Sequence, residues 1–143
     1  VGASAAHLVL EHLAEASVPV LLGPPGTYVY KEDDAPDSTL SLPVDMARRG
    51  IPFALVSGDD EAAPQVSLIE RAQTAVRNGL SAEHALRAIT IDAARILRLD
   101  DRVGSVEKGK DADLVLYDGD PFSYTTRIEA VLVNGKVAYR RRD

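Results

Sequence analysis

The sequence has no cysteine, no tryptophan and no long apolar run. Without cysteine there is neither a disulfide framework nor a thiolate to act as nucleophile or metal ligand. No apolar stretch approaches the roughly 20 residues that a membrane-spanning helix needs, so we expect no membrane partner. The chain begins Val-Gly-Ala-Ser, without Met and without the basic segment of a signal peptide. Two interpretations remain: Val1 is not the natural start of the protein, or the chain was trimmed during production.

Basic residues are also scarce relative to acidic ones. The chain carries 16 Lys and Arg against 22 Asp and Glu, for a net charge of −6. Nucleic-acid binding needs clustered basic side chains, so the balance argues against such a partner. The one basic run, Arg140 to Arg142, is most simply a solvated terminus. With 143 residues and 45% hydrophobic content, the chain is long enough for one globular domain, or a domain with an appendage.

The short motifs of several enzyme classes are missing. The sequence contains no Gly-x-Ser-x-Gly, no glycine-rich phosphate loop and no His-x-His. Its three histidines are His7, His12 and His84, and the first two are five residues apart, so they do not share a helical face as zinc ligands four apart do. We expect all three to be ordinary helix residues. Lys108-Gly-Lys110 resembles half of a phosphate clamp, but a turn entering a strand is the simpler interpretation.

Hydrophobic periodicity divides the chain into an alternating first part and an all-β end. Two apolar strands separated by helices indicate a parallel sheet with right-handed crossovers, and Asn134-Gly135 predicts a hairpin between the last two strands. The expected helices span residues 5–16 (capped by Ser4), 43–49 (with Pro43 in its first turn), 64–78, 82–89 (capped by Ser81) and 93–97. The expected strands span residues 18–22, 51–56, 112–117, 128–133 and 136–140, and residues 23–42 are expected to be irregular.

The strand predicted for residues 51–56 is followed by two acids, Asp59 and Asp60. The carboxyl end of a parallel strand is where α/β proteins place their chemistry. There Asp59 could bind a divalent metal or accept a proton, and capping of the next turn is an equally weighted interpretation. Asp60 is better placed for capping. Residues 23–42 read as a solvated loop or, alternatively, a binding loop in which Tyr28 and Tyr30 line a pocket.

The number of predicted strands leaves sheet edges unpaired. Two parallel strands need neighbours on both edges, and three antiparallel strands have the same need. Exposed edges invite pairing with another chain. The chain therefore reads as a slice of a larger fold, or as a homo-oligomer joined through its strand edges.

The second half of the chain contains longer strings that are more specific than these patterns. It resembles the C-terminal end of the metal-dependent amidohydrolase superfamily, in its imidazolonepropionase-like and prolidase-like branch. The strings that carry the resemblance are Gly79-Leu-Ser-Ala-Glu-His-Ala-Leu-Arg-Ala-Ile-Thr90, Ala93-Ala-Arg-Ile-Leu97, Val103-Gly-Ser-Val-Glu-Lys-Gly-Lys-Asp-Ala-Asp-Leu-Val115, Asp118-Gly-Asp-Pro121 and Val131-Leu-Val-Asn-Gly-Lys-Val137.

The resemblance implies an α/β fold in two parts. Residues 1–99 would form the last two β/α units of a (β/α)8 metal-dependent hydrolase barrel, with residues 18–22 and 51–56 similar to its seventh and eighth strands. Residues 100–143 would supply a small antiparallel β piece to a composite β-sandwich domain. Asp59 falls where the family keeps its eighth-strand aspartate, which implies a metal-site and proton-transfer carboxylate. The implied cofactor is a divalent metal, zinc first.

The sequence departs from the family pattern in what it lacks. The family's His-x-His pair and middle-strand ligands lie upstream of anything present, and His7 is not assigned as a ligand. One carboxylate cannot hold a catalytic zinc, which usually has three protein ligands. We expect that a longer parent hydrolyses a C–N bond (a non-peptide or cyclic amide, or a dipeptide) with metal-activated water, while this chain alone is inactive. The alternatives are a metal-free truncated relative acting as an oligomerisation or interaction module, and a product of proteolysis or misplaced gene boundaries.

Overall fold

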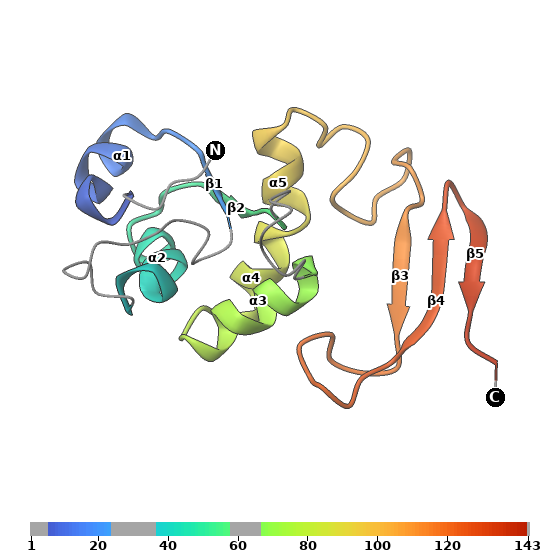
Figure 1. Cartoon of the computed structure of the whole chain (residues 1–143). Coiled ribbons are helices and arrows are strands. Elements are labelled where there is room, and N and C mark those ends of the chain that lie inside the picture. The colour runs from blue at the N-terminus through green and yellow to red at the C-terminus, as the bar shows by residue number, and fades with distance from the viewer. Residues whose placement is uncertain (1–5, 24–36, 58–66, 143) are drawn as a thin grey trace.

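The computed structural model describes residues 6–23, 37–57 and 67–142. Figure 1 shows their arrangement. None of the helices within these ranges has both the length and the apolar character needed to cross a membrane. In chain order the elements are η1 (Ala6–Leu8, a 3-10 helix), α1 (Leu10–Ala16), β1 (Val20–Leu22), α2 (Asp37–Arg48), β2 (Phe53–Leu55), α3 (Leu68–Arg77), α4 (Ala82–Ala88), α5 (Ile91–Ile96), β3 (Leu114–Tyr117), β4 (Ile128–Val133) and β5 (Lys136–Arg140).

The strands β1 and β2 form a parallel pair, as the apolar runs predicted, although each is shorter than expected. Val20 lies opposite Phe53 and Leu22 opposite Leu55. All three residues of β2 are buried, because helices cover the pair on both sides. Figure 1 shows α1 and α2 on one side of the pair and α3, α4 and α5 on the other. The core therefore lies around the two strands.

The first expected helix is interrupted. Residues 5–16 were expected to form one helix, but the structure has η1, then a break at Val9, then α1. Val9 adopts φ −129° and ψ 20°, which is not helical, and its side chain is exposed. The expected cap, Ser4, lies outside the described residues. Leu10 starts α1 and is buried.

The helix α2 is longer than the sequence indicated and starts earlier. It begins at Asp37, so residues 37–42 are helical rather than irregular, and Pro43 lies inside the helix rather than in its first turn. An interior proline costs about 3 kcal/mol. Leu42, Val44 and Met46 are all buried, and each such side chain gains roughly 1.5–3 kcal/mol on burial. Core packing thus outweighs the missing backbone hydrogen bond.

The helix α3 starts at Leu68 behind a capping box in which Ser67 and Glu70 bond to each other's backbone N–H. Leu68, its first residue, is 39% exposed. The buried residues of α3 are Arg71, Ala72 and Ala75, so an arginine occupies the core-facing stripe. The helix ends before Gly79, whose φ of 102° suits glycine.

The helix α4 has the predicted cap at Ser81, whose Oγ accepts the backbone N–H of His84 at 3.2 Å. We expect Ser81→Ala to destabilise the chain by about 1 kcal/mol, because the N–H of His84 loses its acceptor. Urea unfolding monitored by circular dichroism measures the change. Ser81→Asp keeps an acceptor and is the matched control, for which we expect near wild-type stability. Equal losses in both variants would contradict the capping role.

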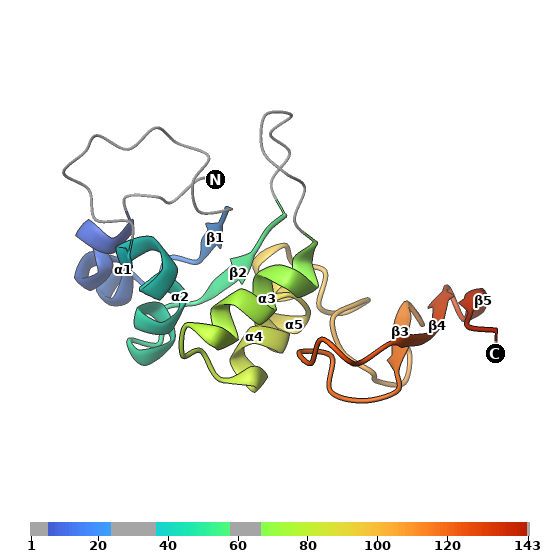
Figure 2. The same ribbon diagram turned by 60° about the horizontal axis from the view of Figure 1, so that its bottom comes forward.

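The strands β3, β4 and β5 form an antiparallel sheet in that order. The bounds of β4 and β5 are those the sequence predicted, and Asn134 and Gly135 turn the chain between them with φ of 49° and 73°. Figure 2 shows this sheet beyond α3, α4 and α5, away from β1 and β2. The fold is therefore α/β with a small separate antiparallel sheet.

Candidate functional site

The candidate site is the edge at which β1 and β2 end. Because the strands are parallel, their carboxyl ends meet at the same edge of the sheet. The pairing continues one residue past the strands, since the N–H of Val56 donates to the carbonyl of Leu22 at 3.0 Å. Gly23 and Val56 are thus the points at which the chain leaves the two strands.

One side chain from α3 joins these two points. Arg71 donates from Nη1 to the carbonyl oxygen of Val56 and from Nη2 to the carbonyl oxygen of Gly23, the latter at 2.6 Å. The planar fork of a guanidinium can reach two acceptors at once, which a lysine ammonium on a single stem does less well. Figure 2 shows the start of α3 close to the carboxyl end of β2. The arginine therefore ties the helix to both strand ends.

The burial of Arg71 is unusual for its residue type. Only 9% of it is exposed, and it is the one charged residue among the buried residues that the structure describes. Burial lowers the pKa of Arg71 to about 10, so the guanidinium remains charged at neutral pH. The contacts described for this side chain are to carbonyl oxygens. A buried positive charge held by backbone dipoles at a strand mouth calls for a functional explanation.

The sequence missed Arg71, although a signal for it was present. Arg71 lies one residue before Ala72 and four before Ala75, so helical spacing places it beside apolar positions of α3. An arginine inside an apolar stripe is rare enough to be marked as a candidate.

The residues that the sequence did select lie elsewhere. Asp59, Asp60, Tyr28 and Tyr30 fall outside the described residues, so their roles stay predictions. Among the described residues, no group of three His, Asp or Glu side chains is placed to hold a metal ion. This part of the chain does not by itself fit a zinc site.

The histidines that the structure describes show ordinary surroundings. The Nδ1 of His84 lies 2.7 Å from Ser81 Oγ within the α4 cap, and both residues are exposed. His12 is an exposed residue of α1.

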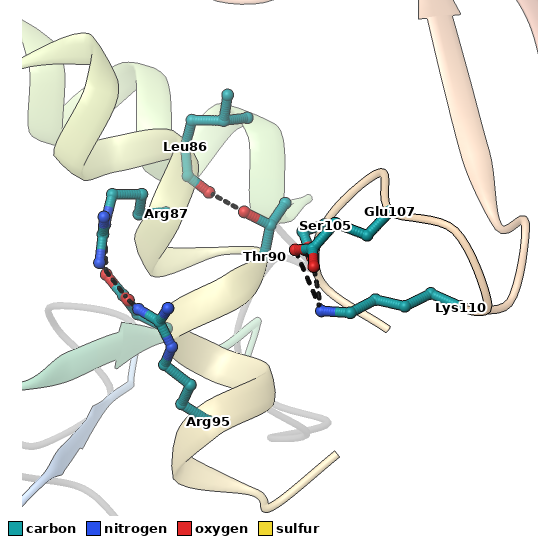
Figure 3. A network of polar contacts seen from close by, with 8 residues as sticks. Leu86, Arg87, Thr90, Arg95, Ser105, Glu107 and Lys110 are labelled. Carbon is teal, nitrogen blue, oxygen red and sulfur yellow. Dashed lines mark hydrogen bonds and ion pairs between the residues drawn. The ribbon is translucent and has the colours of Figure 1, made fainter. Parts of the chain in front are cut away.

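The Lys108-Gly-Lys110 string forms a turn ahead of β3, as the simpler interpretation had it. The side chain of Lys110 is 12% exposed, and its Nζ lies 2.6 Å from Ser105 Oγ and 3.4 Å from Glu107 Oε1. Ser105 in turn donates to Glu107, which lowers the pKa of that carboxyl. Figure 3 shows the three side chains converging beside α5. The side chain of Lys110 is thus engaged within the turn.

A second polar cluster joins α4 to α5. Arg87 forms a two-pronged contact with the carboxylate of Asp92, at 3.0 Å from Nε and 2.8 Å from Nη2. Arg95 adds a third contact at 3.1 Å. Figure 3 shows the side chains of Arg87 and Arg95 turned toward each other across the helix junction. Since both arginines are more than 40% exposed, we interpret the cluster as a surface tie between helices.

Three further carboxylates in the second half of the chain accept backbone N–H groups. Asp113 Oδ1 accepts the N–H of Asn134 at 2.8 Å, at the start of the hairpin turn. Asp118 accepts the N–H of Arg127 at 2.7 Å, and this bond, with Arg141 adding to it, lowers the pKa of Asp118. Asp120 accepts the N–H of Phe122 at 2.9 Å. These carboxylates shape turns and carry no visible chemistry.

The described residues thus form a parallel strand pair flanked by helices, with an antiparallel sheet beyond them. This is the architecture of an α/β protein. The chain belongs to the amidohydrolase family, which it matches over residues 3–139. Members of this family are generally metal-dependent.

Within the family its sequence is similar to the imidazolonepropionase of Thermoplasma acidophilum, at 35% identity over 102 residues, covering 66% of this chain and 25% of that protein. The crystal structure of an amidohydrolase from Thermotoga maritima is similar at 35% identity and a TM-score of 0.83, covering 96% of this chain and 36% of that one. A zinc-bound adenosine deaminase from Xanthomonas campestris shares the fold at 21% identity and a TM-score of 0.63, covering 91% and 34% of the two chains. The chain thus spans about a quarter to a third of these relatives.

Proposed function

We propose that this chain is the part of a C–N-hydrolysing amidohydrolase that contributes the edge formed by β1 and β2, with Asp59 as its metal-site and proton-transfer carboxylate. The observation that carries the proposal is the amidohydrolase match over residues 3–139. The substrate is a small molecule with a C–N bond, a cyclic amide of the imidazolone type first. The similarity to imidazolonepropionases supports that choice.

The proposal gives Asp59 its place by sequence position. It follows Val56 by three residues, and Val56 is held at the edge by Leu22 and Arg71. A carboxylate there is suited to accept the proton of an attacking water and to return it to the leaving nitrogen. The proposal takes the other metal ligands from outside this chain, because the sequence has no His-x-His pair and the described residues supply no group of ligands. Tyr28 and Tyr30 remain weak candidates for contacts to the substrate.

The proposal also divides the chain in two. Residues 1–99 belong to a barrel as its last two β/α units, and residues 100–143 belong to a composite β-sandwich. Two features support the division: β1 and β2 share one core with α1 to α4, and β3 to β5 form a sheet of their own. Phe122 and the bond from Gln73 to the Pro121 carbonyl, at 3.3 Å, tie the second part to that core.

Comparing two purified forms tests the proposal: the 143-residue chain, and a form extended upstream by its own coding sequence. We expect the extended form to contain about one or two zinc equivalents and to hydrolyse imidazolonepropionate or a related cyclic amide. We expect the 143-residue chain to show neither. Elemental analysis and loss of the imidazolone absorbance measure the two properties. An extended form that is metal-free and inert on cyclic amides and dipeptides alike would refute the proposed function.

A second candidate function, a homo-oligomerisation module, has one observation in its favour. Apolar side chains of the β3–β5 sheet are exposed, with Val137 57% and Tyr139 49% accessible. Exposed apolar surface on a sheet favours association with a second copy. Light scattering of the 143-residue chain separates the two functions. A chain that stays monomeric at millimolar concentration counts against the module.

A further inference from the structure

The side chain of Arg71 occupies a place that core packing alone does not explain. It extends from the second turn of α3 to the carboxyl edge of β1 and β2, where it bonds the carbonyls of Val56 and Gly23. Burial removes the hydration of the arginine, and the two acceptors that the described part of the chain supplies are neutral carbonyls. A helix packed against a sheet is stabilised more simply by an aliphatic residue at such a position. Burial of the arginine therefore costs stability. In return, its two hydrogen bonds fix the points at which the chain leaves β1 and β2.

These exits lead to the segments in which the sequence predicts function. Residues 24–36, which include Tyr28 and Tyr30, follow Gly23, and Asp59 follows Val56 by three residues. A carbonyl held by a hydrogen bond fixes the peptide plane that follows it. Holding both carbonyls with one rigid guanidinium fixes the two exits relative to each other as well as to α3.

Taking the proposed hydrolase activity as its basis, the geometry points to Arg71 as a positioning residue for the reaction. It clamps the ends of β1 and β2 through the Gly23 and Val56 carbonyls, and so holds the strand end from which the chain continues to Asp59. Misplacing a reacting group by about 1 Å can cost roughly 100-fold in rate, so such a clamp affects turnover more than substrate affinity.

The first arm of the test needs no activity. Hydrogen exchange of the 143-residue chain reports on the N–H of Val56, which bonds Leu22 at the clamped edge, and on the N–H of Val20, which bonds Pro52 at the far end of the same strand pair. In Arg71→Met we expect exchange of the Val56 amide to accelerate at least ~10-fold more than exchange of the Val20 amide, because the opening is local. Equal acceleration at both ends would overturn the clamp.

The second arm uses the zinc-containing extended form. We expect Arg71→Met to lower kcat at least ~10-fold with KM changed less than about twofold, and Arg71→Lys, which keeps the charge but reaches one carbonyl, to fall between Met and wild type. The matched control is Arg77→Met on the exposed face of α3, where Arg77 contacts Thr74 and the Tyr124 ring. A folded Arg71→Met enzyme with wild-type kcat would overturn the positioning role.

The two arms also separate this inference from the proposed function. If the extended form hydrolyses nothing, the function fails, while the exchange arm still decides whether Arg71 clamps the strand ends. If Arg71→Met does not fold, Arg71→Lys replaces it in both arms. A Lys variant with wild-type exchange at Val56 and wild-type kcat would overturn the claim that the two-pronged fork is required.

Discussion

Replacement of Gly104 by alanine is expected to destabilise the chain by about 3 kcal/mol. The backbone of Gly104 has φ of 95°, a conformation that costs an L-residue roughly 1–2 kcal/mol. A Cβ there would stand 2.8 Å from the Ala94 Cβ and 2.9 Å from the Ile91 Cα of helix α5. Since the second contact is backbone, relief requires a shift of the turn or the helix, and such overpacking costs a further ~1–3 kcal/mol.

Gly109 offers a matched control for Gly104. It has the same φ of 95°, yet a Cβ built on it meets nothing within 4 Å. Gly109→Ala therefore carries only the backbone cost of about 1–2 kcal/mol. Thermal unfolding followed by circular dichroism measures the stability of both variants. For a chain of this size we expect Gly104→Ala to melt roughly 10 °C below wild type. Equal losses in the two variants would show that the close approach to α5 is not what requires glycine at 104.

Several residues of the string from Val103 to Val115 have structural contacts that require their residue type. Gly104 brings the chain onto α5, the triangle of Ser105, Glu107 and Lys110 closes the turn, and Asp113 holds the following hairpin. The string that carried the family resemblance thus builds the connection between the helices and the β3–β5 sheet. The contacts of the string are structural, and the proposed reaction is assigned to Asp59.

The sequence predicted the fold best where all the signals for an element lie within a few residues. The strands around Asn134-Gly135 were predicted with the observed bounds, because strand periodicity and turn chemistry agree within a few residues. The same holds for the Ser81 cap. The start of α2 and the break at Val9 were not predicted, because Pro43 locally favours the first turn of a helix and residues 5–16 have helical periodicity throughout.

The same contrast holds for the candidate site, of which one part was predicted from the sequence and another was not. That β1 and β2 end at one edge followed from two apolar runs in a β/α alternation. The role of Arg71 did not, because it depends on two carbonyls 15 and 48 residues away in sequence. Asp59 was preferred to its neighbour Asp60 from its position after the strand, and the resemblance added the metal-site role. A substitution in each of these two carboxylates is therefore the sharpest experiment on the reaction itself.

In the zinc-containing extended form, we expect Asp59→Asn to reduce kcat/KM by roughly 10²–10⁴-fold, the range for loss of a positioned acid–base group. The amide is nearly the same size as the carboxylate but cannot accept the proton of the attacking water. We also expect the acid limb of the pH profile of kcat/KM to disappear, because that limb reports the protonation of the essential base in the free enzyme.

Asp60→Asn is the matched control, since it makes the same change one residue along the chain. If Asp60 caps the next turn, its amide still accepts a backbone hydrogen bond and activity should change less than about threefold. Zinc content measured in both variants separates a lost proton acceptor from a lost ligand. A large loss in Asp60→Asn with activity retained in Asp59→Asn would exchange the two roles. The edge built by β1, β2 and Arg71 would then present the second carboxylate, not the first, to the reacting bond.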